Sequence, residues 1–260
     1  MIIPMKTILL TFLLFLPTII LGKVEYNSSI EVLSRSFPFG AFSKFSYEGI
    51  FPIWGNREHS KDIKYGFAGA KGEIRSSALV NYISGNLFIY PIPILGFYLG
   101  QETGLKNIKK IDTFDCNLNN CRGKMNRSFA GIKLALAYKD FFLLSDNRWS
   151  EISTDNSEKY FVDEMTSLLG SPEGDQSFIS LNLFGINYNE TNRFGIIYLK
   201  NKMKFNQSDS SMTNFFYDYS WEKNNSLISS IGVFKTRKSQ NVGTLLFLYR
   251  WRTPSEFRLF

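Results

Sequence analysis

The sequence predicts an all-β protein: an antiparallel transmembrane β-barrel of about 12 strands, within a range of roughly 10 to 14, with short turns at one end and longer loops at the other. Three observations predict this fold. They are a secretion signal at the N-terminus, segments of alternating polarity long enough to cross a bilayer, and short connections that take turns with long ones. No later segment is apolar enough to form a spanning helix, so strands would have to cross the membrane.

Residues 1–22 have the layout of a signal peptide. Lys6 precedes an apolar run that extends to Leu21, and a polar stretch follows Gly22. The run is short for a spanning helix, which needs about 20 apolar residues, although an uncleaved anchor is the alternative. We therefore expect cleavage after Gly22 and a single exported β-barrel domain over residues 23–260.

The net charge does not point to nucleic acid. The full chain carries a formal charge of +7, and loss of Lys6 with the signal peptide leaves +6. A basic chain can bind nucleic acid, but this one carries an export signal and no nucleic-acid-binding motif. We therefore expect no nucleic-acid partner.

Alternation with a period of two is the main structural signal. In segment 213–223, Phe215, Tyr217 and Trp221 fall on one face and mostly polar residues fall on the other. A soluble β-sandwich would alternate in the same way, with the aromatic face in its core. Segments of about ten to twelve residues, and aromatic residues near their ends, favour the barrel. The candidate strands are 26–36, 44–51, 63–74, 78–90, 94–103, 128–138, 141–152, 178–188, 195–205, 213–223, 227–237 and 245–252.

The chain ends in Phe260, shortly after the aromatic-rich segment 245–252. A terminal Phe after such a strand resembles the C-terminal signal by which outer-membrane proteins of Gram-negative bacteria are recognised for insertion, although Thr253, Pro254 and Ser255 interrupt the alternation. The resemblance is to the class as a whole. It implies an outer-membrane location reached through the periplasm, contact with membrane lipid and lipopolysaccharide, and help from periplasmic chaperones and the barrel-assembly machinery. It assigns no substrate and no functional residue.

Connections of unequal length indicate how the barrel is oriented in the membrane. Short connections are expected at 139–140, 189–192 and 223–225, and long ones at 104–127 and 153–177. Outer-membrane barrels place short turns in the periplasm and longer loops outside the cell. We therefore expect both long loops to be external and the C-terminus to be periplasmic.

Cys116 and Cys121 are the two cysteines of the chain. In the oxidising compartment that the signal peptide implies, they are expected to form a disulfide within the loop 104–127. Metal binding is the alternative, but no His lies near them. We expect neither a metal nor another cofactor.

Charged residues that alternate with apolar ones are candidates for the lumen, because Lys or Arg facing lipid near the midplane costs about 2–4 kcal/mol. Lys200, Lys202 and Lys204 alternate with Leu199 and Met203, so the three lysines are predicted to point inward. Inside the barrel such charges could either line a conducting pore or form an ionic network that fills it. The full candidate set is Lys200, Lys202, Lys204, Asp218, Glu222, Arg250, Arg252, Lys133 and Glu102.

The long loop 153–177 combines an apolar stripe with acidic residues. Ser157 could begin a short helix with Phe161 and Leu168 on one face, and Gly170 could end it. We expect this loop to form a solvated lid, and a loop inserted into the lumen is the alternative. Its candidate acidic residues, which would face a basic wall in the inserted case, are Asp163, Glu164, Glu173 and Asp175.

These features leave three classes of function. The first is a narrow channel for small polar or anionic solutes, and the second is a closed structural or surface-binding barrel that acts through its external loops. An outer-membrane hydrolase comes last, because His59 is the sole His and is expected to lie in a solvated turn. We therefore predict that the protein is not an enzyme.

Overall fold

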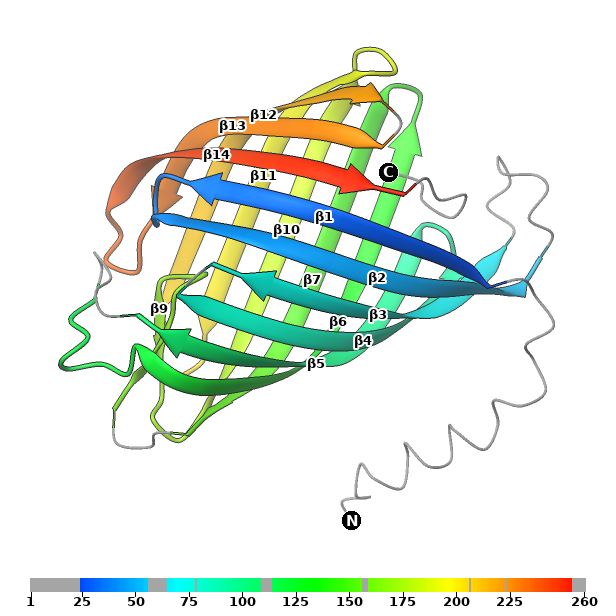
Figure 1. The fold of residues 1–260 in the computed structure, drawn as a ribbon. Coiled ribbons are helices and arrows are strands. Elements are labelled where there is room, and N and C mark those ends of the chain that lie inside the picture. Colours follow the sequence, from blue (N-terminus) through cyan, green and yellow to red (C-terminus); the bar gives the residue numbers. More distant parts are fainter. Residues whose placement is uncertain are drawn as a thin grey trace, which may run out of the picture.

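Twelve strands form a closed antiparallel barrel in the structure, which is a computed structural model (Figure 1). The structure describes residues 24–55, 65–77, 79–108, 114–155, 159–205, 207–222 and 224–253. The predicted signal peptide, His59 and Phe260 lie outside these described residues. The barrel strands are β1 (Glu25–Arg35), β2 (Gly40–Trp54), β3 (Gly66–Ser76), β4 (Val80–Ile92), β5 (Leu95–Asn107), β6 (Arg122–Tyr138), β7 (Phe141–Thr154), β10 (Asp175–Asn187), β11 (Asn192–Met203), β12 (Asp209–Glu222), β13 (Asn225–Lys235) and β14 (Asn241–Arg252).

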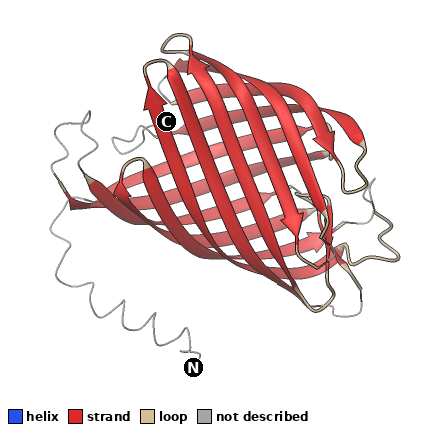
Figure 2. Ribbon diagram, turned by 180° about the vertical axis from the view of Figure 1, so that it is seen from behind, coloured by secondary structure: helices blue, strands red, loops and turns tan. Residues whose placement is uncertain are grey.

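Each barrel strand pairs with the barrel strands before and after it in the chain, and β1 pairs with β14 to close the ring. The strands run obliquely around the barrel, as the view from behind shows (Figure 2). Two further strands, β8 (Phe161–Asp163) and β9 (Leu168–Gly170), form a separate hairpin between β7 and β10. The closed antiparallel ring and its number of strands confirm the predicted fold class.

The two ends of the barrel differ. One end, here called the turn end, holds Val24 and Thr253 together with the short connections 93–94, 139–140, 188–191 and 223–224. The opposite end, the loop end, holds the two longest connections, 108–121 and 155–174. Both are shorter than predicted, because β5 and β6 extend their ladder into the expected loop 104–127 and β7 and β10 do the same at 153–177.

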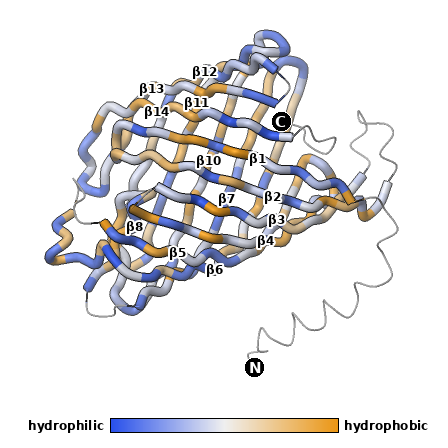
Figure 3. The backbone as a smooth tube through the Cα atoms, viewed as in Figure 1, coloured by the Kyte–Doolittle hydropathy of each residue, from blue (hydrophilic) through white to orange (hydrophobic). Residues whose placement is uncertain are grey.

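The outer surface of the barrel is largely apolar. On β12 the side chains of Phe215, Tyr217 and Tyr219 are exposed, while Phe216 and Asp218 between them are buried inside. The same alternation recurs along the other strands (Figure 3). In an open sheet such exposed aromatic residues would meet water, whereas around a barrel they form the apolar band and the aromatic girdles that a bilayer requires.

The interior is divided into an apolar half and a polar half. Phe142 on β7 and Phe216 on β12 lie with ring centroids 6.4 Å apart, although β10 and β11 separate their strands in the wall. They belong to a cluster that also contains Ile197, Met212, Ile228, Phe234 and Leu246. Side chains from β7 and from β10 to β14 therefore pack against one another in one part of the lumen, and the polar part is formed mainly by β1 to β7.

No helix long and apolar enough to cross a membrane occurs among the described residues. The prediction of a short helix within the loop 153–177 is wrong. The described part of that loop contains the hairpin β8–β9 instead. The apolar residues that suggested a helical stripe are distributed over the two short strands of the hairpin.

Candidate functional site: a plugged lumen

The hairpin β8–β9 is folded around a single aromatic side chain. Phe161 pairs with Gly170 across the hairpin, and Phe161, Val162 and Leu168 are almost completely buried. A Cβ atom on Gly170 would lie 2.0 Å from Cζ of Phe161, so only glycine allows the ring to pack here. The residue spacing resembles a helical stripe, but burial on both sides of the hairpin satisfies it equally well.

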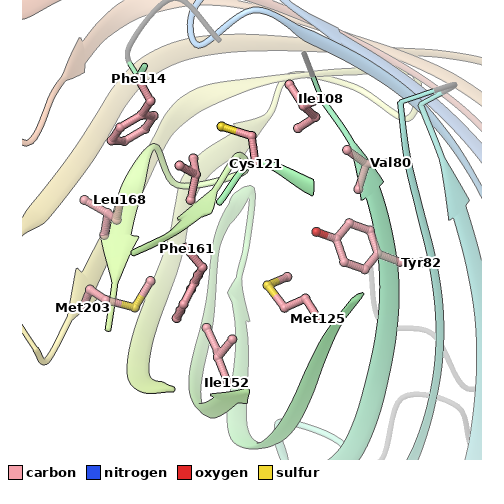
Figure 4. Close-up of a cluster of buried hydrophobic side chains, with 11 residues drawn as sticks. Val80, Tyr82, Ile108, Phe114, Cys121, Met125, Ile152, Phe161, Leu168 and Met203 are labelled. Atoms are coloured by element: carbon pink, nitrogen blue, oxygen red, sulfur yellow. The ribbon is translucent and has the colours of Figure 1, made fainter. Parts of the chain in front are cut away.

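A small apolar core surrounds this hairpin at the loop end (Figure 4). It combines Phe161 and Leu168 with Tyr82 from β4, Met125 from β6 and Met203 from β11. These strands lie on different sides of the barrel, so the hairpin fills the space between them. The hairpin is therefore inside the lumen, and the expectation of a solvated lid is wrong.

The other long connection, 108–121, forms hydrogen bonds with the hairpin. The backbone N–H of Asn120 donates to the carbonyl of Tyr160 at 2.8 Å, and the N–H of Val162 donates to the carbonyl of Asn120 at 3.2 Å. Cys116 and Cys121 form a disulfide in the same connection. This crosslink restricts the segment that hydrogen-bonds β8, so it stabilises the plug more than the barrel wall.

Backbone carbonyls of the hairpin are held by side chains from three separate wall strands. Lys106 on β5 donates to the carbonyl of Val162 at 2.6 Å. Arg35 on β1 donates to the carbonyl of Met165 at 3.3 Å, and Ser210 on β12 donates to that of Thr166 at 2.7 Å. Polar groups that would otherwise be buried without partners are satisfied in this way. The hairpin is thus tied to opposite sides of the barrel.

A buried ionic network anchors the tip of β8. Arg127 on β6 donates to Asp163 at 3.0 Å and to Glu102 on β5 at 2.7 Å, and Arg75 on β3 lies 3.4 Å from Glu102. Burial raises the pKa of Asp163, but the charges of Arg127 and Lys106 outweigh this effect and hold that pKa below its usual range. Asp163 is therefore ionised in the docked hairpin at neutral pH.

Glu164 makes a second polar contact with the wall. The hydroxyl of Tyr82 donates to its carboxylate at 2.5 Å, and Nζ of Lys106 lies 3.8 Å away. Tyr82 reaches this position because it lies over Gly104, where a Cβ atom would be 2.1 Å from its ring. Two neighbouring carboxylates of one hairpin therefore meet cationic and hydroxyl groups of β4, β5 and β6.

A polar cavity of about 530 Å³ lies in the part of the lumen formed by β1 to β7 and the last residues of β14. It extends to Pro93 in a turn-end connection, and Glu102 of the anchoring network also borders it. Its seven basic and five acidic residues give a net charge of +2. The charged lining residues are Lys44, Lys71, Arg75, Lys133, Arg148, Arg250 and Arg252, with Glu31, Glu48, Glu73, Glu102 and Asp146.

Ion pairs inside the cavity link several neighbouring strands. Nζ of Lys44 lies 2.8 Å from Glu31, and Nε of Arg250 lies 3.5 Å from the same carboxylate. Lys133 on β6 lies 3.6 Å from Asp146 on the neighbouring strand β7. The excess of basic groups is thus spread along the cavity and is not gathered at one point.

Several of the residues predicted for the lumen do lie inside the barrel. Glu102, Lys133, Arg250 and Arg252 line the cavity. Asp218 is buried on the inner face of β12. Glu222 lies exposed at the turn end, where its carboxylate accepts a hydrogen bond from Asn225.

Lys200 and Lys202 lie on the outer face of β11 and Lys204 is exposed just beyond its end, so the predicted inward orientation of these lysines is wrong. Ile197, Asn201 and Met203 are the buried inward residues of this strand, while Lys202 is exposed and Lys200 half-buried. The prediction assumed that apolar residues face lipid, but the lumen beside β11 is itself apolar. Lys204 follows the strand at the loop end, where its Nζ donates to Oε1 of Gln176 at 3.1 Å.

The four acidic residues of the long loop have different environments. Asp163 and Glu164 belong to the plug. Asp175 begins β10 and accepts hydrogen bonds from the N–H groups of Ser171 and Phe205, so it stabilises the base of the loop. Glu173 is exposed.

Sequence reasoning missed the wall residues that hold the plug, Arg127, Lys106, Tyr82 and Arg35. The expected loop 104–127 contains Lys106 and Arg127, although Lys106 continues the alternation of β5 and Arg127 that of β6, both with an inward orientation. That parity is the signal that could have found them. Among the described residues, no group of three or more His, Cys, Asp or Glu side chains could hold a metal ion.

The closed wall, the apolar outer face and the charged interior define a transmembrane β-barrel with an internal plug. Neither a family model nor a curated protein matches the sequence. A solved structure of the KdgM porin is similar with a TM-score of 0.46 and 9% identity, covering 86% of this chain and 98% of that chain. The translocator domain of the autotransporter NalP from Neisseria meningitidis has a TM-score of 0.39 and 9% identity, covering 90% of this chain and 91% of that chain. The β domain of the Bordetella autotransporter BrkA has a TM-score of 0.39 and 12% identity, covering 88% of this chain and 98% of that chain. These similar structures are outer-membrane β-barrels.

Proposed function

We propose that this protein is an outer-membrane channel for small polar or anionic solutes that the hairpin β8–β9 holds closed. The observation that carries the proposal is the ion pair between Arg127 of the wall and Asp163 of the hairpin, because it joins a removable plug to a lumen that otherwise contains a polar cavity. The channel would conduct when this hairpin leaves its position. We also propose that the protein is not an enzyme.

The apolar outer surface supports the membrane location. Tyr138, Tyr188 and Trp221 are exposed near the turn end, and Trp149 is exposed toward the loop end. Aromatic residues at two levels suit the two interfaces of a bilayer. In the proposed orientation the turn end faces the periplasm, because exported barrels of even strand number keep their short turns and both termini there.

Outward lysines at the loop end fit the outer leaflet. Lys202 and Lys204 would lie at the level of the phosphate groups of lipopolysaccharide, where a basic side chain gains an anionic partner. Their position in this layer removes most of the lipid penalty, which falls to about 0–1 kcal/mol near the interface. We propose outer-membrane lipid and lipopolysaccharide as the contacts of this surface.

The solute preference is inferred from the charge of the cavity. Seven basic residues against five acidic ones leave an excess of positive charge, and basic rings in a pore favour anions. The cavity volume of about 530 Å³ suits a small solute, within the range of roughly 300–1,000 Å³ that is usual for ligand sites.

A second candidate is a permanently closed structural barrel. It is favoured by the packed apolar half of the lumen, where Phe142, Phe216 and Phe234 are almost completely buried. In that case the ion pairs of the polar half would complete the packing and would not line a path for solutes.

The test compares the intact protein with a variant in which a Gly-Ser linker of equal length replaces residues 160–170. In planar bilayers we expect the intact protein to stay mainly closed and the variant to conduct steadily with a preference for anions. Lys238→Ala, in another loop-end connection, is the matched control and should behave like the intact protein. Steady conductance of the intact protein at the level of the variant would contradict gating by the hairpin. Absence of conductance in both proteins would support the structural barrel.

A further inference from the structure

The outer surface of β7 and β10 carries polar side chains at the middle of both strands. Ser145 and Asn147 on β7, and Ser180 and Asn182 on β10, alternate with the inward-facing residues. The register pairs Ser145 with Asn182 and Asn147 with Ser180, so the four residues, here called the lateral polar patch, are contiguous. Comparable mid-strand positions on β1, β4 and β12 carry exposed apolar residues, namely Ile30, Leu87 and Phe215.

A chain of hydrogen bonds runs through the lateral polar patch. Nδ2 of Asn147 donates to Oγ of Ser145 at 3.0 Å, and that hydroxyl donates to Oδ1 of Asn182 at 2.8 Å. Nδ2 of Asn182 donates to Oγ of Ser180 at 3.0 Å. Each amide has a second N–H, and Oδ1 of Asn147 is a further acceptor. None of these groups has a partner among the described residues, so the chain leaves donors and an acceptor directed outward.

Two aromatic pairs frame the patch along the same strands. Trp149 and Phe178 have ring centroids 5.3 Å apart on the side of the loop end. Phe141 and Phe184 have ring centroids 6.3 Å apart on the side of the turn end. Lys200 on β11, the register partner of Ser180, continues the polar surface onto a third strand. The polar centre distinguishes this surface from a lipid-facing wall, while its aromatic edges suit either a membrane interface or a contact between proteins.

Hydrocarbon cannot satisfy the outward amide groups, so an occupant of this surface must itself lie in the membrane and present donors and acceptors at the same depth. A second copy of the chain, inserted in the same direction, does both. Asparagine donates and accepts, so the patch is complementary to itself when a two-fold axis along the membrane normal relates two copies. We propose that the lateral polar patch, with its two aromatic pairs, is the contact surface of a homodimer in the membrane. This proposal rests on the membrane location and not on gating by the hairpin.

The direct test places a photoreactive benzophenone amino acid at position 182 in place of asparagine and illuminates intact membranes. The matched control carries the same group in place of Ile30, at the centre of β1, five strands away from β10 around the ring. We expect an adduct of two copies of this chain from position 182, identified by mass spectrometry, and none from position 30. No adduct, equal adducts at both positions, or an adduct with a different protein at position 182 would overturn the proposal.

A second measurement uses the combined variant Asn147→Leu and Asn182→Leu. Its barrel should still assemble, because leucine suits a lipid-facing position, and this is checked by the shift in gel mobility on boiling. We expect at least a tenfold fall in the ratio of dimer to monomer in mild detergent. The control, Ile30→Val and Leu87→Val, should keep the ratio of the natural sequence. An unchanged ratio in the leucine variant would overturn the proposal, and if that variant fails to assemble, the cross-linking result decides.

Discussion

Arg127 of β6 and Asp163 of the hairpin β8–β9 form an ion pair at 3.0 Å, with side-chain exposures of 2% and 1%. Such a pair contributes little net stability when both members are present, because desolvation offsets most of the attraction. Removal of one member, in contrast, unbalances the buried network: loss of Asp163 leaves Arg127 with Glu102 alone, and loss of Arg127 leaves both carboxylates without their shared cation. Breaking a buried pair in this way costs about 3–5 kcal/mol. The docked position of the plug is therefore highly sensitive to the loss of either side chain.

The first prediction concerns this asymmetry. Asp163→Asn should release the hairpin, because Arg127 would then lack its carboxylate partner there. We expect frequent openings in planar bilayers, with barrel assembly unchanged in gel mobility assays. The combined variant Arg127→Met and Asp163→Asn removes both charges and should be closed more of the time than Asp163→Asn alone. Equal opening of the two variants would show that the charge imbalance does not control docking.

The second prediction concerns pH. The pKa of Asp163 lies below its ordinary value in the docked hairpin, so this group stabilises docking above the ordinary Asp pKa of about 3.9 and loses that contribution as pH falls toward the lowered value. We expect no change in opening between about pH 7 and 5, and more opening below about pH 4. Asp163→Asn should lack the part of this acid response that belongs to Asp163. A rise in opening that begins near neutral pH would point to another group.

The third prediction uses two glycines. Gly170→Ala should loosen the plug, because the new Cβ would lie 2.0 Å from the ring of Phe161. Gly85→Ala is the matched control, since a Cβ on Gly85 has no atom within 4 Å. We expect a higher open probability and faster protease cleavage near the hairpin for Gly170→Ala only. Identical behaviour of the two variants would argue against close packing around Phe161.

The fourth prediction separates inner from outer charges. In the variant with the linker at 160–170, we expect Arg250→Glu with Arg252→Glu to shift the reversal potential in a salt gradient toward cations. Lys200→Glu with Lys202→Glu should leave the reversal potential almost unchanged, because both lysines are on the outer face of β11. A larger shift from the lysine pair would contradict that orientation.

The strands of the barrel wall could be predicted from the sequence because polar and apolar residues alternate along each strand. The face assigned to lipid was right for β12 and β14, where Phe215 and Phe247 are exposed, but wrong for β11. On β11 the alternation of Ile197 and Leu199 with Lys200 fits either orientation, and packing in one cluster with Phe142 of β7 and Leu246 of β14 inside the lumen decides between them. That packing joins strands distant in the chain, which a pattern within one strand cannot reveal.

The plug was not predictable for a related reason. Phe161 and Leu168 have a spacing that suits a helix, whereas the hairpin is selected by long-range partners. Lys106 holds one of its carbonyls and the backbone of Asn120 pairs with β8. Local propensity therefore could not identify the structure of this loop or its place in the lumen.

Closure of the lumen from the loop end is tested most directly by a thiol inside the cavity. Asn86→Cys places a thiol among the residues that line it, and Cys116 and Cys121 are already joined. We expect a membrane-impermeant maleimide to leave this thiol unlabelled in intact cells, to label it when the linker replaces residues 160–170, and to label Lys238→Cys at the loop end in both backgrounds. Rapid labelling of Asn86→Cys from outside in the otherwise intact protein would contradict closure by the hairpin.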